Sequence, residues 1–163
     1  MPPVPGLRRR RRALPSAPRP RPPAYYLVAG VDLDEEMERL RTLGAFAGGP
    51  LAAARPELKV RRASRRPNRL GFAVPSQFRL SVTAYPDIRA GDALETLLHE
   101  LTHLHVGRAA EAHAWHGPAF KRTLAEAMQE GYGVSIPAPR STLHGPYAEA
   151  IEQALARPPD ALV

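Results

Sequence analysis

The sequence contains no cysteine among its 163 residues. This excludes disulfide bonds, zinc sites built from thiolates and catalysis by a thiol, and it fits a reducing compartment. No apolar run approaches the roughly 18 residues of a membrane-spanning helix. The basic start of the chain is followed by proline-rich sequence, where a signal peptide would have an apolar stretch. We therefore expect a soluble cytoplasmic protein with no membrane partner.

Acidic residues are absent from the first part of the chain. The formal net charge is +7, and residues 1–24 alone hold seven arginines and no acid, five of them in the run Arg8–Arg12. The rest of the chain therefore sums to zero, although residues 55–89 contain nine basic residues against two acidic ones. The proline and arginine content predicts a disordered tail over residues 1–24. This tail is either a polybasic arm for nucleic acid or a solvated segment without a specific partner.

The length fits one domain with tails. We expect a monomer whose tail at residues 1–24 is followed by a domain over residues 25–140. Residues 141–163 should form a short C-terminal helix, at about 146–156, and a fraying end. A further amphipathic helix is predicted over residues 31–46, with Asp32 as its cap.

The periodicity of apolar residues changes toward two between Glu57 and Tyr85. Three short strands are predicted there, near residues 57–63, 70–74 and 78–84. Tight connections between them suggest a small antiparallel sheet with helices on one face, which makes the fold class α+β. The edge of the third strand is a candidate site for an extended peptide.

Five arginines cluster around the expected first hairpin of this sheet. They are Arg61, Arg62, Arg65, Arg66 and Arg69. They form either a patch that binds phosphate or acidic groups beside a cleft, or a solvated strand face and loop. No aromatic residue lies between the first and the last of them, which weakens the case for single-stranded nucleic acid.

The segment from Asp92 to Val106 is predicted to be an amphipathic helix. Asp92 is a suitable N-cap with Glu95 completing a capping box, and Gly107 is a suitable end. Five leucines gather on one face at 100° per residue: Leu94, Leu97, Leu98, Leu101 and Leu104. His105 falls within this apolar face, so we expect it to be packed in the core.

The opposite face of that helix carries His99 and His103, with Glu100 between them. Two histidines one turn apart project from the same side of a helix and can hold one metal ion. This HExxH pattern is typical of zinc peptidases, in which the two imidazoles bind zinc and the carboxylate acts as general base toward water. The residue that stabilises the oxyanion stays open among Tyr85, Tyr132 and several arginines.

A catalytic zinc site usually has three protein ligands and an open fourth position. The candidates for the third ligand are His113, His116 and Glu111. His116 precedes a predicted helix that begins near Pro118, with Phe120, Leu124 and Met128 facing inward, and that rigid element would position it. His113 lies deeper in the connection and has less to hold it.

The run from Leu97 to Phe120 resembles the SprT-like family of zinc metalloproteases, because His-Glu-Leu-Thr-His is followed by His-Gly-Pro-Ala-Phe. The resemblance covers roughly residues 57–131. It implies Zn²⁺ bound by His99, His103 and His116, with Glu100 as catalytic base. It also implies a compact zincin-type fold, with helices packed on a small three-stranded antiparallel sheet.

The sequence departs from many family members because it has no cysteine-rich zinc ribbon. The resemblance therefore supports peptidase chemistry on protein or peptide substrates better than it supports action on nucleic-acid-associated proteins. Nucleic acid would have to bind through Arg8–Arg12 and the Arg61–Arg69 patch. The alternative to an enzyme is a non-catalytic, zinc-stabilised binding module whose basic tail serves nucleic acid or a partner.

Overall fold

The structure is a computed structural model that describes residues 21–110, 116–136 and 145–158. The α-helices are α1 (Leu33–Leu40), α2 (Pro50–Ala53), α3 (Ala90–Ala110), α4 (Pro118–Tyr132) and α5 (Pro146–Ala156). The strands are β1 (Leu27–Val28), β2 (Val31–Asp32), β3 (Glu57–Arg62), β4 (Gly71–Val74) and β5 (Arg79–Ala84). Short 3-10 turns lie at η1 (Pro23–Tyr26), η2 (Gly44–Phe46) and η3 (Pro75–Gln77). Most of the predicted N-terminal tail lies outside the described residues.

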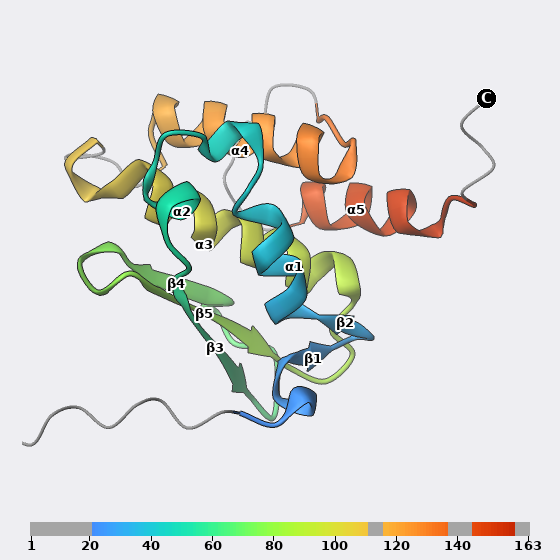
Figure 1. The fold of residues 1–163 in the computed structure, drawn as a ribbon. Coiled ribbons are helices and arrows are strands. Elements are labelled where there is room, and N and C mark those ends of the chain that lie inside the picture. Colours follow the sequence, from blue (N-terminus) through green and yellow to red (C-terminus); the bar gives the residue numbers. More distant parts are fainter. Residues whose placement is uncertain (1–20, 111–115, 137–144, 159–163) are drawn as a thin grey trace, which may run out of the picture.

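Helix α3 lies at the centre of the molecule, with the strands β3, β4 and β5 on one side and α4 and α5 on the other (Figure 1). The α+β class is therefore confirmed. No helix in the described part of the chain is long and apolar enough to cross a membrane.

The sheet differs from the expected antiparallel one. Its strand order is β3-β5-β4, in which β4 pairs antiparallel with β5 while β3 pairs parallel with β5. A second, two-stranded antiparallel sheet joins β1 and β2. Because the chain reverses twice between β3 and β5, these two strands run in the same direction. Their side-by-side position then makes the pairing parallel, and the predicted hairpin between the first two strands is wrong.

The same strand order corrects the predicted peptide-binding edge. Strand β5 has a hydrogen-bonded neighbour on each side. On one side β3 pairs with it from Glu57 opposite Arg79 to Arg62 opposite Ala84, and on the other β4 pairs with it from Gly71 opposite Val82 to Val74 opposite Arg79. It therefore has no free edge for a peptide. Strand β4 is an outer strand, and it contacts α3.

Helix α1 begins where the sequence predicts. Asp32 caps it, because its Oδ1 accepts hydrogen bonds from the backbone N–H groups of Asp34 at 2.9 Å and Glu35 at 3.2 Å. The helix ends at Leu40 rather than near residue 46, and Leu43 is extended before the turn η2. Helix α5 has the predicted bounds.

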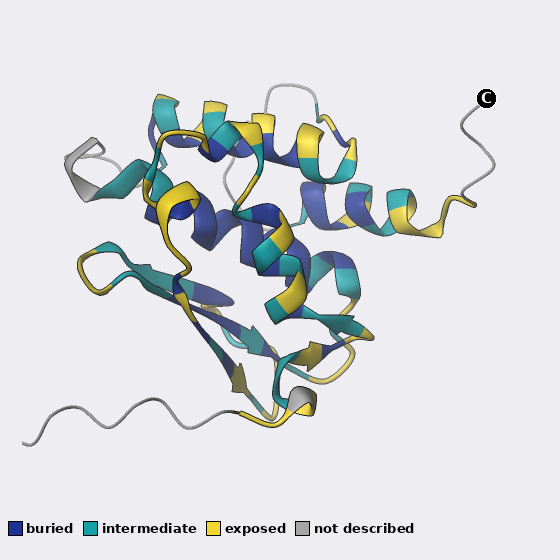
Figure 2. Ribbon diagram, viewed as in Figure 1, coloured by how far each residue is buried: buried dark blue, intermediate teal, exposed yellow. Residues whose placement is uncertain are grey.

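Helix α3 is buried along most of its length, as Figure 2 shows. The five leucines of its predicted apolar face are all at most 3% exposed. Its regular part ends at Gly107, whose φ of 70° and ψ of 167° are not helical, as the sequence predicts. It begins at Ala90, one residue before Gly91 and two before the expected cap Asp92.

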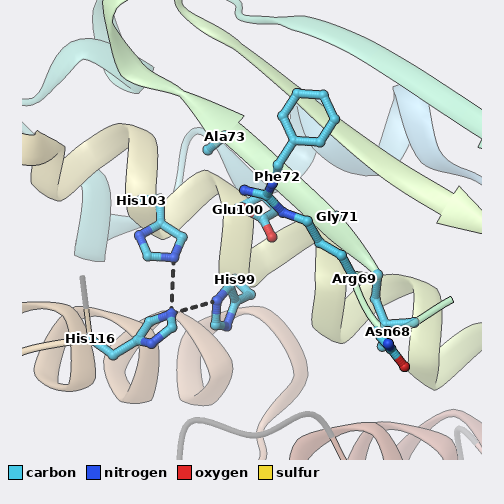
Figure 3. A pocket seen from close by; sticks show the side chains of 10 residues that line it. Asn68, Arg69, Gly71, Phe72, Ala73, His99, Glu100, His103 and His116 are labelled. Carbon is cyan, nitrogen blue, oxygen red and sulfur yellow. Dashed lines mark hydrogen bonds between the residues drawn. The ribbon is translucent and has the colours of Figure 1, made fainter. Parts of the chain in front are cut away.

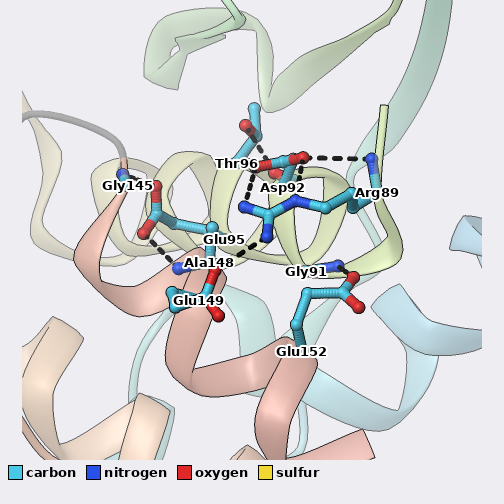
Figure 4. Close-up of polar contacts among 9 residues, drawn as sticks. All are labelled: Arg89, Gly91, Asp92, Glu95, Thr96, Gly145, Ala148, Glu149 and Glu152. Atoms are coloured by element: carbon cyan, nitrogen blue, oxygen red, sulfur yellow. Dashed lines mark hydrogen bonds and ion pairs between the residues drawn. The ribbon is translucent and has the colours of Figure 1, made fainter. Parts of the chain in front are cut away.

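Glu95 does not form the predicted capping box of α3. Its buried carboxylate accepts hydrogen bonds from the backbone N–H groups of Gly145 at 2.8 Å and Ala148 at 2.7 Å, at the start of α5 (Figure 4). In the opposite direction, the Gly91 N–H donates to the Glu152 carboxylate at 2.6 Å. Helices α3 and α5 are therefore joined at the N-terminal end of each by hydrogen bonds from backbone N–H groups to a glutamate side chain of the other helix.

We expect Glu95→Gln to lower the free energy of unfolding by about 1–3 kcal/mol, because the amide leaves a buried backbone N–H without an acceptor. Urea denaturation measures this change. Glu126→Gln, on the exposed side of α4, is the matched control and should unfold like the parent. Equal stability of the two variants would contradict a structural role for Glu95.

Candidate metal centre

Three histidine side chains meet between α3 and the start of α4. His99 and His103 lie one turn apart on α3, and His116 lies two residues before α4 begins at Pro118. The Nε2 atom of His116 lies 3.1 Å from the Nε2 atoms of both His99 and His103 (Figure 3). Figure 3 shows the rings of His99 and His103, from α3, and that of His116, from the segment before α4, pointing toward one another.

The geometry of these histidines fits a single metal ion. One nitrogen from each lies within 4.8 Å of the others. Two nitrogens bound at about 2.0–2.1 Å to one tetrahedral zinc are about 3.3–3.4 Å apart, close to the observed spacing. Burial, together with the neighbouring His116, lowers the pKa of His103 to about 4. Its imidazole is thus neutral, the form that donates a lone pair to a metal. The three residues could therefore hold a metal ion.

Phe120 fixes the position of the three rings. Its ring centroid lies 4.9 Å from His99, 4.4 Å from His103 and 4.9 Å from His116. The side chain is fully buried on the first turn of α4. The sequence predicts that Phe120 faces inward, and the structure adds that it packs against all three imidazoles at once.

A carboxylate lies beside the histidines in the same cleft. Glu100 is only 4% exposed, and this burial raises its pKa to about 8, although the positive charge of Arg69 acts in the opposite direction. The cleft has a volume of about 290 Å³. It is lined by His99, Glu100, His103 and His116 on one side and by residues 68–73 on the other. The arrangement places a titratable carboxyl group beside three histidines that could hold a metal ion.

Residues 40–140 match the model of the SprT-like family. The chain belongs to the SprT-like family. No curated protein and no solved structure matches it. The matched span contains the whole histidine cluster and the strands beside it, whereas α5 lies beyond its end.

Several predicted residues of this SprT-like domain lie away from the cleft or cannot be placed. His105 packs against Phe46 at 5.3 Å between ring centroids, and burial lowers its pKa. This confirms that it is a packed histidine. The alternative ligands His113 and Glu111 lie outside the described residues.

The two tyrosines considered for the oxyanion also lie elsewhere. The Tyr132 hydroxyl donates to the Glu36 carboxylate at 2.8 Å, and burial raises its pKa. Tyr85 lies in another surface pocket, near Pro86 and Ile88. Neither lines the cleft that holds the histidines.

The arginines of the predicted patch in the SprT-like domain are all exposed, and several of them have partners within the protein. Arg62 donates to the backbone carbonyl of Tyr25 at 3.1 Å and so ties the N-terminal segment to β3. Arg66 lies over the ring of Tyr85, at 5.8 Å from its centroid. Arg69 lines the cleft. Arg62, Arg66 and Arg69 thus have different surroundings, whereas Arg61 and Arg69 lie near the same ring, that of Phe72. The hairpin around which we expected the arginines to cluster is absent, because β3 and β4 are not paired.

The sequence did not identify β4 as a wall of the cleft. The available signal was Gly71 at the start of the strand. A Cβ atom there would lie 2.6 Å from the Ser81 carbonyl oxygen, 2.7 Å from Thr96 Cγ2 and 3.2 Å from Glu100 Cγ. Only glycine therefore lets β4 approach α3 this closely, because β4 is confined between α3 and the backbone of β5.

We expect Gly71→Ala to lower the free energy of unfolding by about 1–3 kcal/mol, since the added methyl group forces strand and helix apart. Chemical denaturation of the variant against Ser76→Ala, an exposed position in η3, measures this effect. Parent-like stability of Gly71→Ala would show that the strand moves away at no cost.

Proposed function

We propose that this SprT-like protein is a zinc-dependent metallopeptidase. His99, His103 and His116 are the proposed zinc ligands, and Glu100 is the proposed general base. The observation that carries the proposal is the convergence of three imidazole Nε2 atoms beside a buried carboxylate, with His116 at 3.1 Å from each of the other two. Family membership supports the same chemistry.

Zinc held by three imidazoles supplies Lewis-acid chemistry, which polarises a carbonyl and makes water acidic enough to attack near neutral pH. The role of Glu100 is to accept a proton from the attacking water at a carboxylate oxygen and to pass it to the leaving amine. Burial favours this transfer, because it raises the pKa of Glu100 toward neutral pH, and a general base works best when its pKa lies near the pH of the reaction. The role of Phe120 is to hold the three rings in place.

Strand β4 is the proposed binding edge for the substrate backbone. It is an outer strand of the sheet, and Gly71, Phe72 and Ala73 line the cleft beside the histidines. A peptide added to a strand edge is held by main-chain hydrogen bonds, which do not depend on its sequence. This placement replaces β5, which is enclosed between its neighbours.

Cleavage of casein with and without a chelator tests the proposal. We expect hydrolysis by the protein as purified, nearly complete loss of cleavage when a chelator removes the ion, and recovery after zinc is added. The alternative is a zinc-stabilised binding module, which would bind zinc but would not cleave casein. Metal content alone does not separate the two functions.

A narrower proposal is that the substrates are proteins associated with nucleic acid. It is supported by the basic tail and by Arg65 and Arg66, which are exposed near the sheet. Under this proposal, DNA added at low salt stimulates casein cleavage, and removal of residues 1–24 reduces the stimulation. No stimulation by single- or double-stranded DNA would contradict it.

A further inference from the structure

The cleft contains one charged side chain that the proposed chemistry does not use. Arg69 immediately precedes the Leu70–Gly71 step into β4, and Figure 3 shows its side chain extended along the cleft toward Glu100. Among the described residues that line the cleft, Arg69 and Glu100 are the only ones that carry a guanidinium or carboxyl group. A guanidinium therefore lies where a bound substrate would pass.

The ring of Phe72 supports this guanidinium. The Arg69 Cζ atom lies 5.4 Å from the centroid of Phe72, and the Arg61 Cζ atom lies 4.7 Å from the same centroid. Both distances are within the range of cation–π attraction, which is about 6 Å. Phe72 thus concentrates two positive charges at the rim of the cleft and limits the freedom of Arg69.

Arg69 forms no ion pair with a carboxylate in the described part of the chain, although its charge acts on the buried Glu100 carboxyl group. Other arginines of this protein pair with carboxylates: Arg39 with Glu36, Arg41 with Glu38, Arg55 with Asp34 and Arg89 with Asp92. For Arg69, no carboxylate of a described residue lies within ion-pair distance. Because a guanidinium presents a planar fork of donors that matches a carboxylate, it is well suited to bind an acidic group of an incoming molecule.

Resting on the proposed peptidase function, we infer that Arg69 is a specificity residue that binds a substrate carboxylate, so that the protein prefers peptides with Asp or Glu near the scissile bond. The peptide backbone lies along β4, and the acidic side chain reaches the guanidinium between Phe72 and Glu100. The Arg61 guanidinium, which lies near the same Phe72 ring, adds positive charge that attracts such acidic peptides to the cleft. Phe72 is a positioning residue, since it acts through Arg69.

Peptide binding tests the inference without relying on catalysis. The protein used carries Glu100→Gln, so that it does not cleave the probe, and is loaded with zinc. The probes are fluorescent peptides that share one sequence except at a single position, which is Asp, Asn or Lys. A series of such sets moves this position along the peptide. At the best position we expect Asp to bind about tenfold more tightly than Asn, as for a hydrogen bond to a charged group. Adding Arg69→Gln should abolish this difference, and Arg69→Glu should shift the preference to Lys. Arg122→Gln, an exposed cation on α4, is the matched control and should keep the preference for Asp.

Cleavage of the same peptides by the protein with Glu100 intact separates this inference from the proposed function. We expect Arg69→Gln to raise KM for the Asp peptide about tenfold and to leave the Asn peptide unchanged, with kcat nearly constant for both. Phe72→Leu should weaken the preference partially. Binding that prefers Asp in the absence of any cleavage would support the role of Arg69 and contradict the peptidase. Equal binding of Asp and Asn peptides, no binding of either, or an equal fall in kcat for both peptides in Arg69→Gln would overturn the inference.

Discussion

Glu100→Gln is expected to bind zinc like the parent and to cleave casein about 10²–10⁴-fold more slowly. The substituted amide has nearly the same shape as the carboxylate, so the cleft and the three imidazoles should stay in place. It cannot accept a proton from water, and the general-base step is therefore lost. Zinc content by atomic spectroscopy and the initial rate of fluorescent casein cleavage measure the two properties on one sample.

The control for Glu100→Gln is Glu126→Gln, which makes the same chemical change on the exposed side of α4. It should retain both zinc and activity. If Glu100→Gln binds zinc normally and cleaves casein as fast as the parent, the proposed mechanism is wrong. If it loses zinc, Glu100 has a structural role in the site that the proposal does not include.

His116→Ala is expected to weaken zinc binding by more than about a hundredfold, because even the outer-shell partners of metal ligands contribute roughly 10–100-fold to affinity. The remaining pair, His99 and His103, would hold the ion from one helix alone. Competition with a colorimetric zinc chelator measures the affinity. Thermal unfolding gives a second readout, since a ligand that binds only the folded state raises the melting temperature. Zinc should stabilise the parent and leave His116→Ala nearly unchanged.

Two further histidines give controls for this prediction. His105→Ala removes an imidazole that packs against Phe46, so it should lower stability while zinc affinity is retained. His113→Ala tests the alternative third ligand directly and should retain zinc. Loss of zinc by His113→Ala with retention by His116→Ala would show that the third ligand was assigned to the wrong residue.

The features of the site that could be predicted from sequence are mostly local. His99 and His103 share a helix face because their spacing matches the helical period, and that geometry does not depend on the rest of the fold. The exclusion of His105 follows from the same period, since it falls among the leucines that face the core. The cap at Asp32 and the helix end at Gly107 are likewise set by neighbouring residues.

The errors involve partners that lie far away in the sequence. A carboxylate three residues after a possible cap predicts a capping box, yet Glu95 bonds Gly145 and Ala148, about fifty residues further along the chain. Alternation along β5 predicts a strand with one buried face, and it carries no information about which strands lie on either side. The parallel β3–β5 pair, the enclosed β5 and the outer position of β4 all follow from strand order.

Residue type and helical spacing were therefore sufficient to indicate a candidate metal-binding pair and a base in His99-Glu100-Leu101-Thr102-His103. The third histidine, His116, was indicated by the resemblance to the SprT-like family. Only the tertiary structure brought His116 to 3.1 Å from the other two imidazoles and placed Phe120 against all three rings. Only the tertiary structure, too, placed β4 and Arg69 across from Glu100. These contacts depend on the packing of α4 and the sheet against α3, which is decided by side chains distant in the chain meeting in one core.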